Sequence, residues 1–178
     1  MPRTRPALDY ALLGLLARGP ASGYDLRKIF QTTALGRYSD SPGSIYPALA
    51  RLERQGLIDG RTEQSGHRRR VFHLTMRGRH AMTEWIEQPI AVDDLLRDAA
   101  IVDLRLAFMS DAAPGQLEGF LGQYARAAAE YVKRLEAGRD EFENAISRSA
   151  ALAFELGITL ARARASWVRT TASAEQAA

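Results

Sequence analysis

Apolar residues recur at helical spacing in three segments near the start of the chain. The first segment, residues 8–18, stops at Gly19 and Pro20, which break helices. The second begins at Ser22 and runs to about Thr33, and the third runs from Ile45 to Gly56. We therefore predict three helices with the apolar stripes Leu8, Leu12, Leu15 and Leu16, then Tyr24, Leu26, Ile29 and Phe30, then Ile45, Ala48, Leu49 and Leu52.

The period of the pattern changes after the third helix. Leu57 and Ile58 begin a strand, and the stretch RTEQSGHRRRVFHLT contains two short alternating runs around Ser65 and Gly66. This pattern predicts a β-hairpin. Three helices followed by a hairpin is the order of a winged helix-turn-helix. In that fold the third helix enters the DNA major groove, and the hairpin, or wing, lies along the backbone or in the minor groove.

Helical patterns fill the rest of the chain. Residues 75–88 form one helix, and residues 95–109 are apolar almost all round, which predicts a helix buried on several sides. Residues 115–145 follow a heptad seam for about four repeats. A last helix spans about residues 150–170, and we expect the tail from Thr171 to fray. The fold class is therefore mainly α with a small β-hairpin.

The long helices lack a compact domain against which to bury their apolar faces. A second copy of the chain is the simplest partner, so we predict a homodimer. A hairpin between the last two helices of one chain is the alternative, and the two arrangements can coexist. The predicted dimerisation residues are Leu117, Leu121, Tyr124, Tyr131, Leu135, Phe142, Leu156 and Trp167.

Composition restricts the classes of protein that fit this pattern. The 178 residues are 46% hydrophobic and 25% charged, as in an ordinary globular chain. No apolar run reaches the roughly 18 residues of a membrane helix, and the start lacks a signal peptide's apolar core. We therefore expect no membrane partner and a cytoplasmic location. The absence of cysteine excludes disulfides, thiolate nucleophiles and cysteine-based zinc sites.

Charge is distributed unevenly between the two halves of the chain. Residues 1–80 carry 14 lysine and arginine residues against 6 aspartate and glutamate residues, a net charge of +8. Residues 81–178 carry 10 against 15, a net charge of −5. This asymmetry indicates that the first half meets a polyanion such as double-stranded DNA. A solvated basic surface is the alternative explanation.

The third helix has an unusual start, SPGSIYP, which contains two prolines and a glycine. With Ser44 as the N-cap, Pro47 falls in the first turn, where its missing N–H costs little. The unpaired N–H groups of that turn can bind a phosphate, and Gly43 presents no side chain to obstruct it. The residues of this helix that then face a DNA groove are Tyr46, Pro47, Ala50, Arg51 and Arg54.

Three consecutive arginines, Arg68, Arg69 and Arg70, follow the turn of the predicted hairpin. Successive strand residues point to opposite faces, so at least one of these side chains points away from the domain. Guanidinium groups suit phosphate contacts or insertion into a narrow minor groove. A solvated charge cluster is the alternative.

These motifs, in this order and spacing, resemble the PadR family of bacterial transcriptional regulators. The resemblance runs through ALLGLLARGPASGYDLRKIF, SPGSIYPALARLERQGLI and GHRRRVFHLTMRGR, within roughly residues 7–88. It implies a winged helix-turn-helix DNA-binding domain at residues 1–88. It also implies a helical dimerisation region, of the virulence-activator type, at residues 89–178. Such proteins usually act as repressors of nearby genes.

The family's contacts to DNA can be transferred to this chain by position. Arg51 has an alternative role, because a charge at its place in the helix can also form an intramolecular ion pair. The residues to which the resemblance assigns DNA contacts are Tyr24, Ser41, Ser44, Tyr46, Arg51, Arg68, Arg69 and Arg70.

The resemblance further implies a response to small molecules, since relatives sense phenolic acids and planar drugs. Aromatic side chains of the helical region either line a cavity for such an effector or pack in the core. We identify no ligand from the sequence. The aromatic residues concerned are Trp85, Phe108, Tyr124, Tyr131, Phe142 and Trp167.

Two other functions are alternatives to DNA binding. An enzyme needs a nucleophile, an acid–base pair or a metal, and His67, His73 and His80 have no ligand-like spacing. Asp93 and Asp94 lie at an expected helix start, where the helix dipole explains them. We therefore predict no catalytic residues, no metal ligands and no cofactor. A winged-helix module that binds proteins instead of DNA is the other alternative, and the basic first half argues against it.

Overall fold

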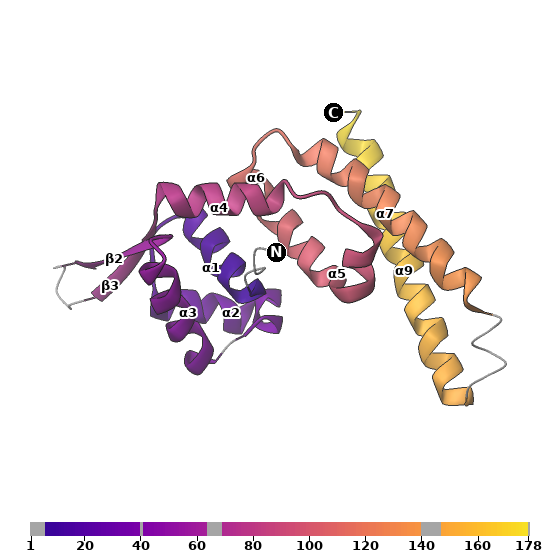
Figure 1. Ribbon diagram of the computed structural model, residues 1–178, viewed down its shortest axis with the longest axis horizontal. Helices are drawn as coiled ribbons and strands as arrows, with labels where there is room; N and C mark the ends of the chain where they lie inside the picture. The colour runs from indigo at the N-terminus through magenta and orange to yellow at the C-terminus, as the bar shows by residue number, and fades with distance from the viewer. Residues whose placement is uncertain (1–5, 40, 64–68, 140–146, 178) are drawn as a thin grey trace. The chain divides into compact units, whose positions relative to one another are not determined.

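The computed structural model describes residues 6–39, 41–63, 69–139 and 147–177 (Figure 1). The chain divides into two compact units. The N-terminal unit comprises residues 1–87 and 107–114, and the C-terminal unit comprises residues 88–106 and 115–178. The division near residue 88 is therefore interrupted, because residues 107–114 return to the N-terminal unit.

The three helices near the start of the chain confirm the predicted order. They are α1 (Ala7–Arg18), α2 (Gly23–Thr32) and α3 (Pro42–Arg54), with the short 3₁₀ helix η1 (Ala34–Arg37) before α3. Ser22 is the N-cap of α2, and its Oγ accepts the backbone N–H of Asp25 at 3.2 Å. The Asp25 carboxylate accepts the backbone N–H of Ser22 in return, at 3.3 Å. This capping box fixes the start of α2.

The predicted hairpin is present and forms part of a three-stranded antiparallel sheet. Its strands are β2 (Ile58–Glu63) and β3 (Arg69–Leu74), and β1 (Ala21–Ser22) pairs with the other edge of β3. The sheet order is β1-β3-β2. The sequence pattern does not predict β1, because two residues are too few to show an alternation. The turn residues Ser65 and Gly66 lie outside the described residues.

The core of the N-terminal unit lies between the helices and one face of the sheet. Leu12, Leu26, Phe30 and Leu49 are each almost fully buried. Two more helices complete this core, α4 (Met76–Ile86) and α6 (Met109–Ala112). Met82, Trp85 and Ile86 of α4 are buried, and the Trp85 ring stacks on Tyr10 with 4.0 Å between ring centroids. This packing supports α1 and the buried side of α3, whose other side forms the surface described below.

Over its described residues, the C-terminal unit contains the helices α5 (Val92–Ala107), α7 (Leu117–Ala137) and α9 (Arg148–Glu175), and the last residue of α5 belongs to the N-terminal unit. The predicted helix over residues 95–109 is buried on several sides, at Leu95, Ala100, Val102 and Leu104, but Asp98, with φ −161° and ψ 87°, kinks α5, which ends at Ala107. The Asp98 carboxylate accepts the Ala100 N–H at 3.1 Å, a local bond that competes with helical pairing. The predicted frayed tail is wrong, because α9 continues to Glu175.

α7 and α9 run side by side and pack against each other within one chain (Figure 1). The intramolecular hairpin, one of the two predicted arrangements, is therefore present. In the described parts of the chain, no helix combines the length and apolar character of a membrane span.

Candidate nucleic-acid interface

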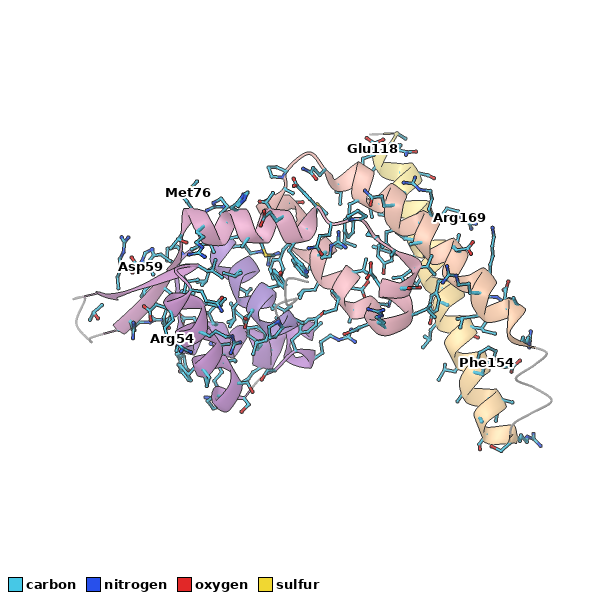
Figure 2. All side chains as sticks on the ribbon, viewed as in Figure 1. Arg54, Asp59, Met76, Glu118, Phe154 and Arg169 are labelled. Atoms are coloured by element: carbon cyan, nitrogen blue, oxygen red, sulfur yellow. The ribbon has the colours of Figure 1, made fainter. Side chains whose placement is uncertain are left out.

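α3 presents one face to solvent and buries the other. The predicted apolar stripe, Ile45, Ala48, Leu49 and Leu52, is buried against the rest of the N-terminal unit. On the opposite face Tyr46 is 46% exposed, and Arg54 projects from the last turn (Figure 2). The side chains predicted to face a DNA groove are thus on the solvent side of α3, except Arg51, which is half-buried.

The start of α3 differs from the sequence prediction. The N-cap is Ser41 rather than Ser44, and its Oγ accepts the Gly43 N–H at 3.2 Å. The helix starts earlier because Pro42, with its fixed φ, suits the first helical position and needs no N–H there. Pro47 therefore lies inside the helix, where it cannot donate the usual bond to the Gly43 carbonyl. Ser41, Gly43, Ser44 and Pro47 are all exposed at this end.

A groove with a volume of about 640 Å³ lies between α2, α3 and β3. Tyr24, 65% exposed, and Tyr46 both line it. Gly23 lets the two helices approach, because a Cβ atom there would lie 2.6 Å from the Tyr46 ring. Arg69 and Arg70 line the same groove. The fold thus brings together aromatic and cationic side chains from three separate segments.

Arg69, the first residue of β3, contacts the start of α2. Its Nη2 donates to the Ser22 Oγ at 2.8 Å and forms an ion pair with Asp25. The side chains of Arg69 and Asp25 are 49% and 44% exposed. The contact therefore lies at the surface, within reach of water and of a ligand.

Arg70 is held by the last turn of α3. Its Nη2 donates to both carboxylate oxygens of Glu53 at 2.7 Å, and its guanidinium lies 5.5 Å from the Phe72 ring centroid. Glu53 also accepts the backbone N–H of Gly60, on β2, at 3.0 Å. Glu53 thus connects α3 to both strands of the wing.

Arg51 forms an ion pair with Asp9 of α1. The Arg51 Nε donates to Asp9 Oδ2 at 3.1 Å, and a second contact joins Nη2 to Oδ1. The Asp9 side chain is 1% exposed. The hydrogen bond to Asp9 raises the pKa of the Arg51 guanidinium above its usual value. The alternative role considered for Arg51, an intramolecular pair, is present, and a DNA contact by Arg51 stays a prediction.

Most of the predicted DNA-contacting residues lie on this one exposed side of the N-terminal unit. Arg68 lies outside the described residues. Sequence reasoning missed Asp25 and Glu53, the carboxylates that pair with Arg69 and Arg70. Asp25 had a signal, since it follows Ser22 at capping-box spacing. Glu53 had none, because its partners lie on other elements.

The C-terminal unit exposes a different kind of surface. Leu152, Leu156, Leu160 and Trp167, on α9, are between 54% and 61% exposed. Their spacing places them on one stripe of the helix. The opposite side of α9, which includes Ile158, Ala161, Val168 and Ala172, is buried. α9 is therefore apolar on two faces, and among the described residues only one of these faces is covered.

The residues predicted to form the dimer seam fall into different environments. Leu121 and Tyr124 are buried within their own unit, and Leu117, Tyr131 and Leu135 are partly buried. Leu156 and Trp167 are exposed, and Phe142 lies outside the described residues. The α7 part of the seam is thus largely used inside one chain, and the exposed candidates are on α9.

A partly buried polar cluster joins α5, α7 and α9 of the C-terminal unit. The Tyr124 hydroxyl donates to Asp103 Oδ1 at 2.7 Å, and Arg164 donates to both Asp103, at 2.6 Å, and the Tyr124 oxygen. Burial, with the bond to Asp103, raises the pKa of the Tyr124 hydroxyl far above its usual value. Trp85, Phe108 and Tyr124, considered as cavity-lining residues, are all buried in cores.

The arrangement in the N-terminal unit agrees with comparisons to known proteins. Residues 12–84 match the model of the transcriptional regulator PadR-like family. In this segment the chain is similar to the PadR-like family. The PadR-like segment runs from α1 to α4 and so contains α3, both wing strands, Arg69 and Arg70.

Two curated relatives each match about half of this chain. The negative transcriptional regulator PadR of Bacillus subtilis is 31% identical over 93 residues, 51% of each chain. The transcriptional regulator YqjI of Escherichia coli is 36% identical over 81 residues, 46% of this chain and 36% of that protein. The chain thus spans about half, or less, of these two relatives' length.

One solved structure of similar extent is that of Bacillus subtilis PadR in complex with operator DNA. It covers 96% of this chain and 98% of its own, with 22% identity and a TM-score of 0.46.

Proposed function

We propose that the N-terminal unit binds double-stranded DNA and that the protein regulates transcription, as a repressor. The observation that carries this proposal is the groove where Tyr24, Tyr46, Arg69 and Arg70 lie beside the exposed face of α3. The half of the chain that holds it has a net charge of +8. The family description and the name of the Bacillus subtilis relative, a negative regulator, support the same function.

In this proposal α3 enters the major groove and the wing lies against the backbone. The exposed face of α3 is poor in the arginine and amide side chains that read base edges. Ala50 and Pro47 lie at its centre. We therefore propose that a sizeable share of sequence selection comes from DNA shape, while the arginines contact phosphates.

We propose further that residues 1–88 act as the DNA-binding domain and residues 89–178 as the dimerisation region. The exposed stripe of α9 supports a second copy as partner, because its four large apolar side chains are not covered by any part of the chain that the structure describes. Two α3 helices related by a two-fold axis then read a pseudo-palindromic site with half-sites about 10 base pairs apart, or at a similar spacing set by the dimer. A cytoplasmic location and a non-enzymatic role belong to the same proposal.

The experiment is fluorescence anisotropy of a labelled random-sequence duplex, titrated with the protein at several salt concentrations. With about 6 to 10 phosphate contacts in the dimer, log affinity falls with log salt at a slope of about −5 to −9. A slope near zero, or no binding of the duplex at any salt concentration, contradicts the proposal. Either result favours a winged-helix module that binds proteins.

A further inference from the structure

Arg69 and Arg70, the two described arginines of β3, each have a carboxylate partner at the surface that we propose to face DNA. Arg69 pairs with Asp25 of α2, and Arg70 pairs with Glu53 of α3. The positive charge of each arginine is therefore neutralised by a carboxylate before the protein meets DNA. These two carboxylates determine how much of the wing's charge is available to a phosphate backbone.

The Glu53 contact is built into the local fold. Glu53 is the less exposed partner, at 29%, and it binds Arg70 through both carboxylate oxygens. Gly60 makes room for the pair, since a Cβ atom there would lie 2.6 Å from Glu53 Oε1 and 2.6 Å from Arg70 Nε. A side chain on β2 at this position would push the two groups apart.

The Asp25 contact has a similar character. Asp25 occupies the third position of α2, where its carboxylate accepts the Ser22 N–H and hydroxyl, so its position is fixed before Arg69 binds. Arg69 then adds its own bond to the Ser22 hydroxyl. Because two separate helices each supply one carboxylate, the two pairs are independent of each other.

The strength of these pairs decides what they can do. Exposed ion pairs typically change an equilibrium constant by a factor of up to about five. Such pairs are weak enough for a phosphate to displace, yet each displacement leaves a carboxylate facing the DNA backbone. The net effect is a moderate penalty on every arginine–phosphate contact of the wing.

We infer that Asp25 and Glu53 restrain sequence-independent DNA binding by neutralising Arg69 and Arg70 in the free protein. This inference rests on the proposed DNA-binding function. It assigns a role to two acidic residues that lie beside the basic surface. In a non-specific complex the electrostatic contribution supplies essentially all the affinity, so the restraint is largest there.

The test uses the full chain, a random-sequence duplex and the amide variants Asp25→Asn and Glu53→Gln. The amide oxygen still accepts the Ser22 or Gly60 N–H, so the local fold is kept while the charge is removed. Each variant is expected to bind the duplex up to about fivefold more tightly. Each salt slope is expected to become about 0.9 steeper for each chain bound, because one more arginine per chain is free to release a DNA counterion.

Glu84→Gln is the matched control, because it removes one exposed carboxylate of α4 in the same unit. It corrects for the change in net charge. A double-mutant cycle adds a second check: the gain from Glu53→Gln should vanish in an Arg70→Ala background, and that from Asp25→Asn in an Arg69→Ala background. Circular dichroism melting curves show that each protein is folded.

Three results overturn the inference. Affinities equal to that of Glu84→Gln show that the carboxylates do not restrain the wing. Weaker binding shows that they position the arginines for DNA instead. Both results leave the proposed function intact, whereas an unmodified protein that binds no duplex removes the proposed function and the inference with it.

Discussion

The two units of this chain expose large side chains of opposite kinds. The N-terminal unit presents Tyr24 and Tyr46, whose rings carry a polar hydroxyl, next to arginines. The C-terminal unit presents the leucines and the tryptophan of one α9 stripe. A surface of tyrosine and arginine suits a hydrated, charged ligand, whereas an aliphatic stripe suits a dry partner. This difference supports our proposal that one unit binds DNA and the other binds a second copy of the chain.

The interiors of the two units differ as well. In the N-terminal unit one ion pair, Asp9 with Arg51, joins α1 to the back of α3. In the C-terminal unit a three-membered cluster joins α5, α7 and α9 through Asp103, Tyr124 and Arg164. Each exposed surface is therefore supported by polar contacts behind it, and each support can be removed separately.

The largest effect is expected from Arg51→Ala. This variant distinguishes a role of Arg51 in stabilising the fold from a role in contacting DNA. It leaves the buried Asp9 carboxylate without this partner, and we expect a loss of about 2 to 3 kcal/mol of unfolding free energy, measured by urea denaturation. The cost falls below that of a fully buried pair because the Arg51 side chain is 36% exposed.

Asp9→Asn in the Arg51→Ala background is the control for this prediction. It removes the stranded charge and should recover part of the lost stability. Unchanged stability together with weaker duplex binding would show instead that Arg51 serves DNA and not the fold.

The next effect concerns the stripe on α9. The double variant Leu156→Asp and Leu160→Asp places two charges where we propose a dry interface, and the dimer dissociation constant should rise by about 100-fold or more. Sedimentation velocity measures this change. Leu96→Asp, at a leucine of α5 that is 47% exposed, is the matched control and should leave the dimer intact. If the unmodified protein is monomeric, the stripe on α9 is not a dimer interface, and the proposed difference between the two surfaces is contradicted.

A smaller effect is expected at the wing. Arg69→Ala with Arg70→Ala removes two proposed phosphate contacts in each chain, and affinity for any duplex should fall about 30-fold at 0.15 M salt for each chain bound. Anisotropy titrations check this, and the salt slope should become shallower by about two for each chain. Unchanged affinity would mean that the wing charge serves only its ion pairs with α2 and α3.

The smallest effect is expected from Tyr124→Phe. This change removes one hydroxyl from the partly buried cluster, and it should lower the unfolding free energy by about 1 kcal/mol. Urea denaturation measures the loss, while duplex affinity at a temperature where the protein stays folded should not change. A loss of DNA affinity without a loss of stability would contradict the separate roles of the two units.

Local patterns were sufficient to predict the order of helices and wing strands, because each element shows its own period over several residues. They misplaced the start of α3, since Ser41 and Ser44 are both good caps and only Pro42 at the first helical position decides between them. They missed the kink at Asp98, which depends on one side-chain bond.

Pairings between distant segments lay beyond the reach of sequence patterns. The partners Arg70 and Glu53 are 17 residues apart, and Arg51 and Asp9 are 42 apart. Neither separation leaves a periodic signal, since the contact exists only after the elements have packed. The sequence therefore predicted which arginines lie on the wing, and the structure was needed to show which carboxylates hold them.

Selection of bound fragments from a random DNA pool, performed with the unmodified protein and with the Arg69→Ala and Arg70→Ala double variant, tests the proposed DNA-binding surface most directly. We expect the unmodified protein to enrich a two-fold symmetric motif with half-sites about one helical turn apart, and the variant to recover the same motif with a lower yield. Recovery of unselected sequence by both proteins in equal amounts would contradict the account.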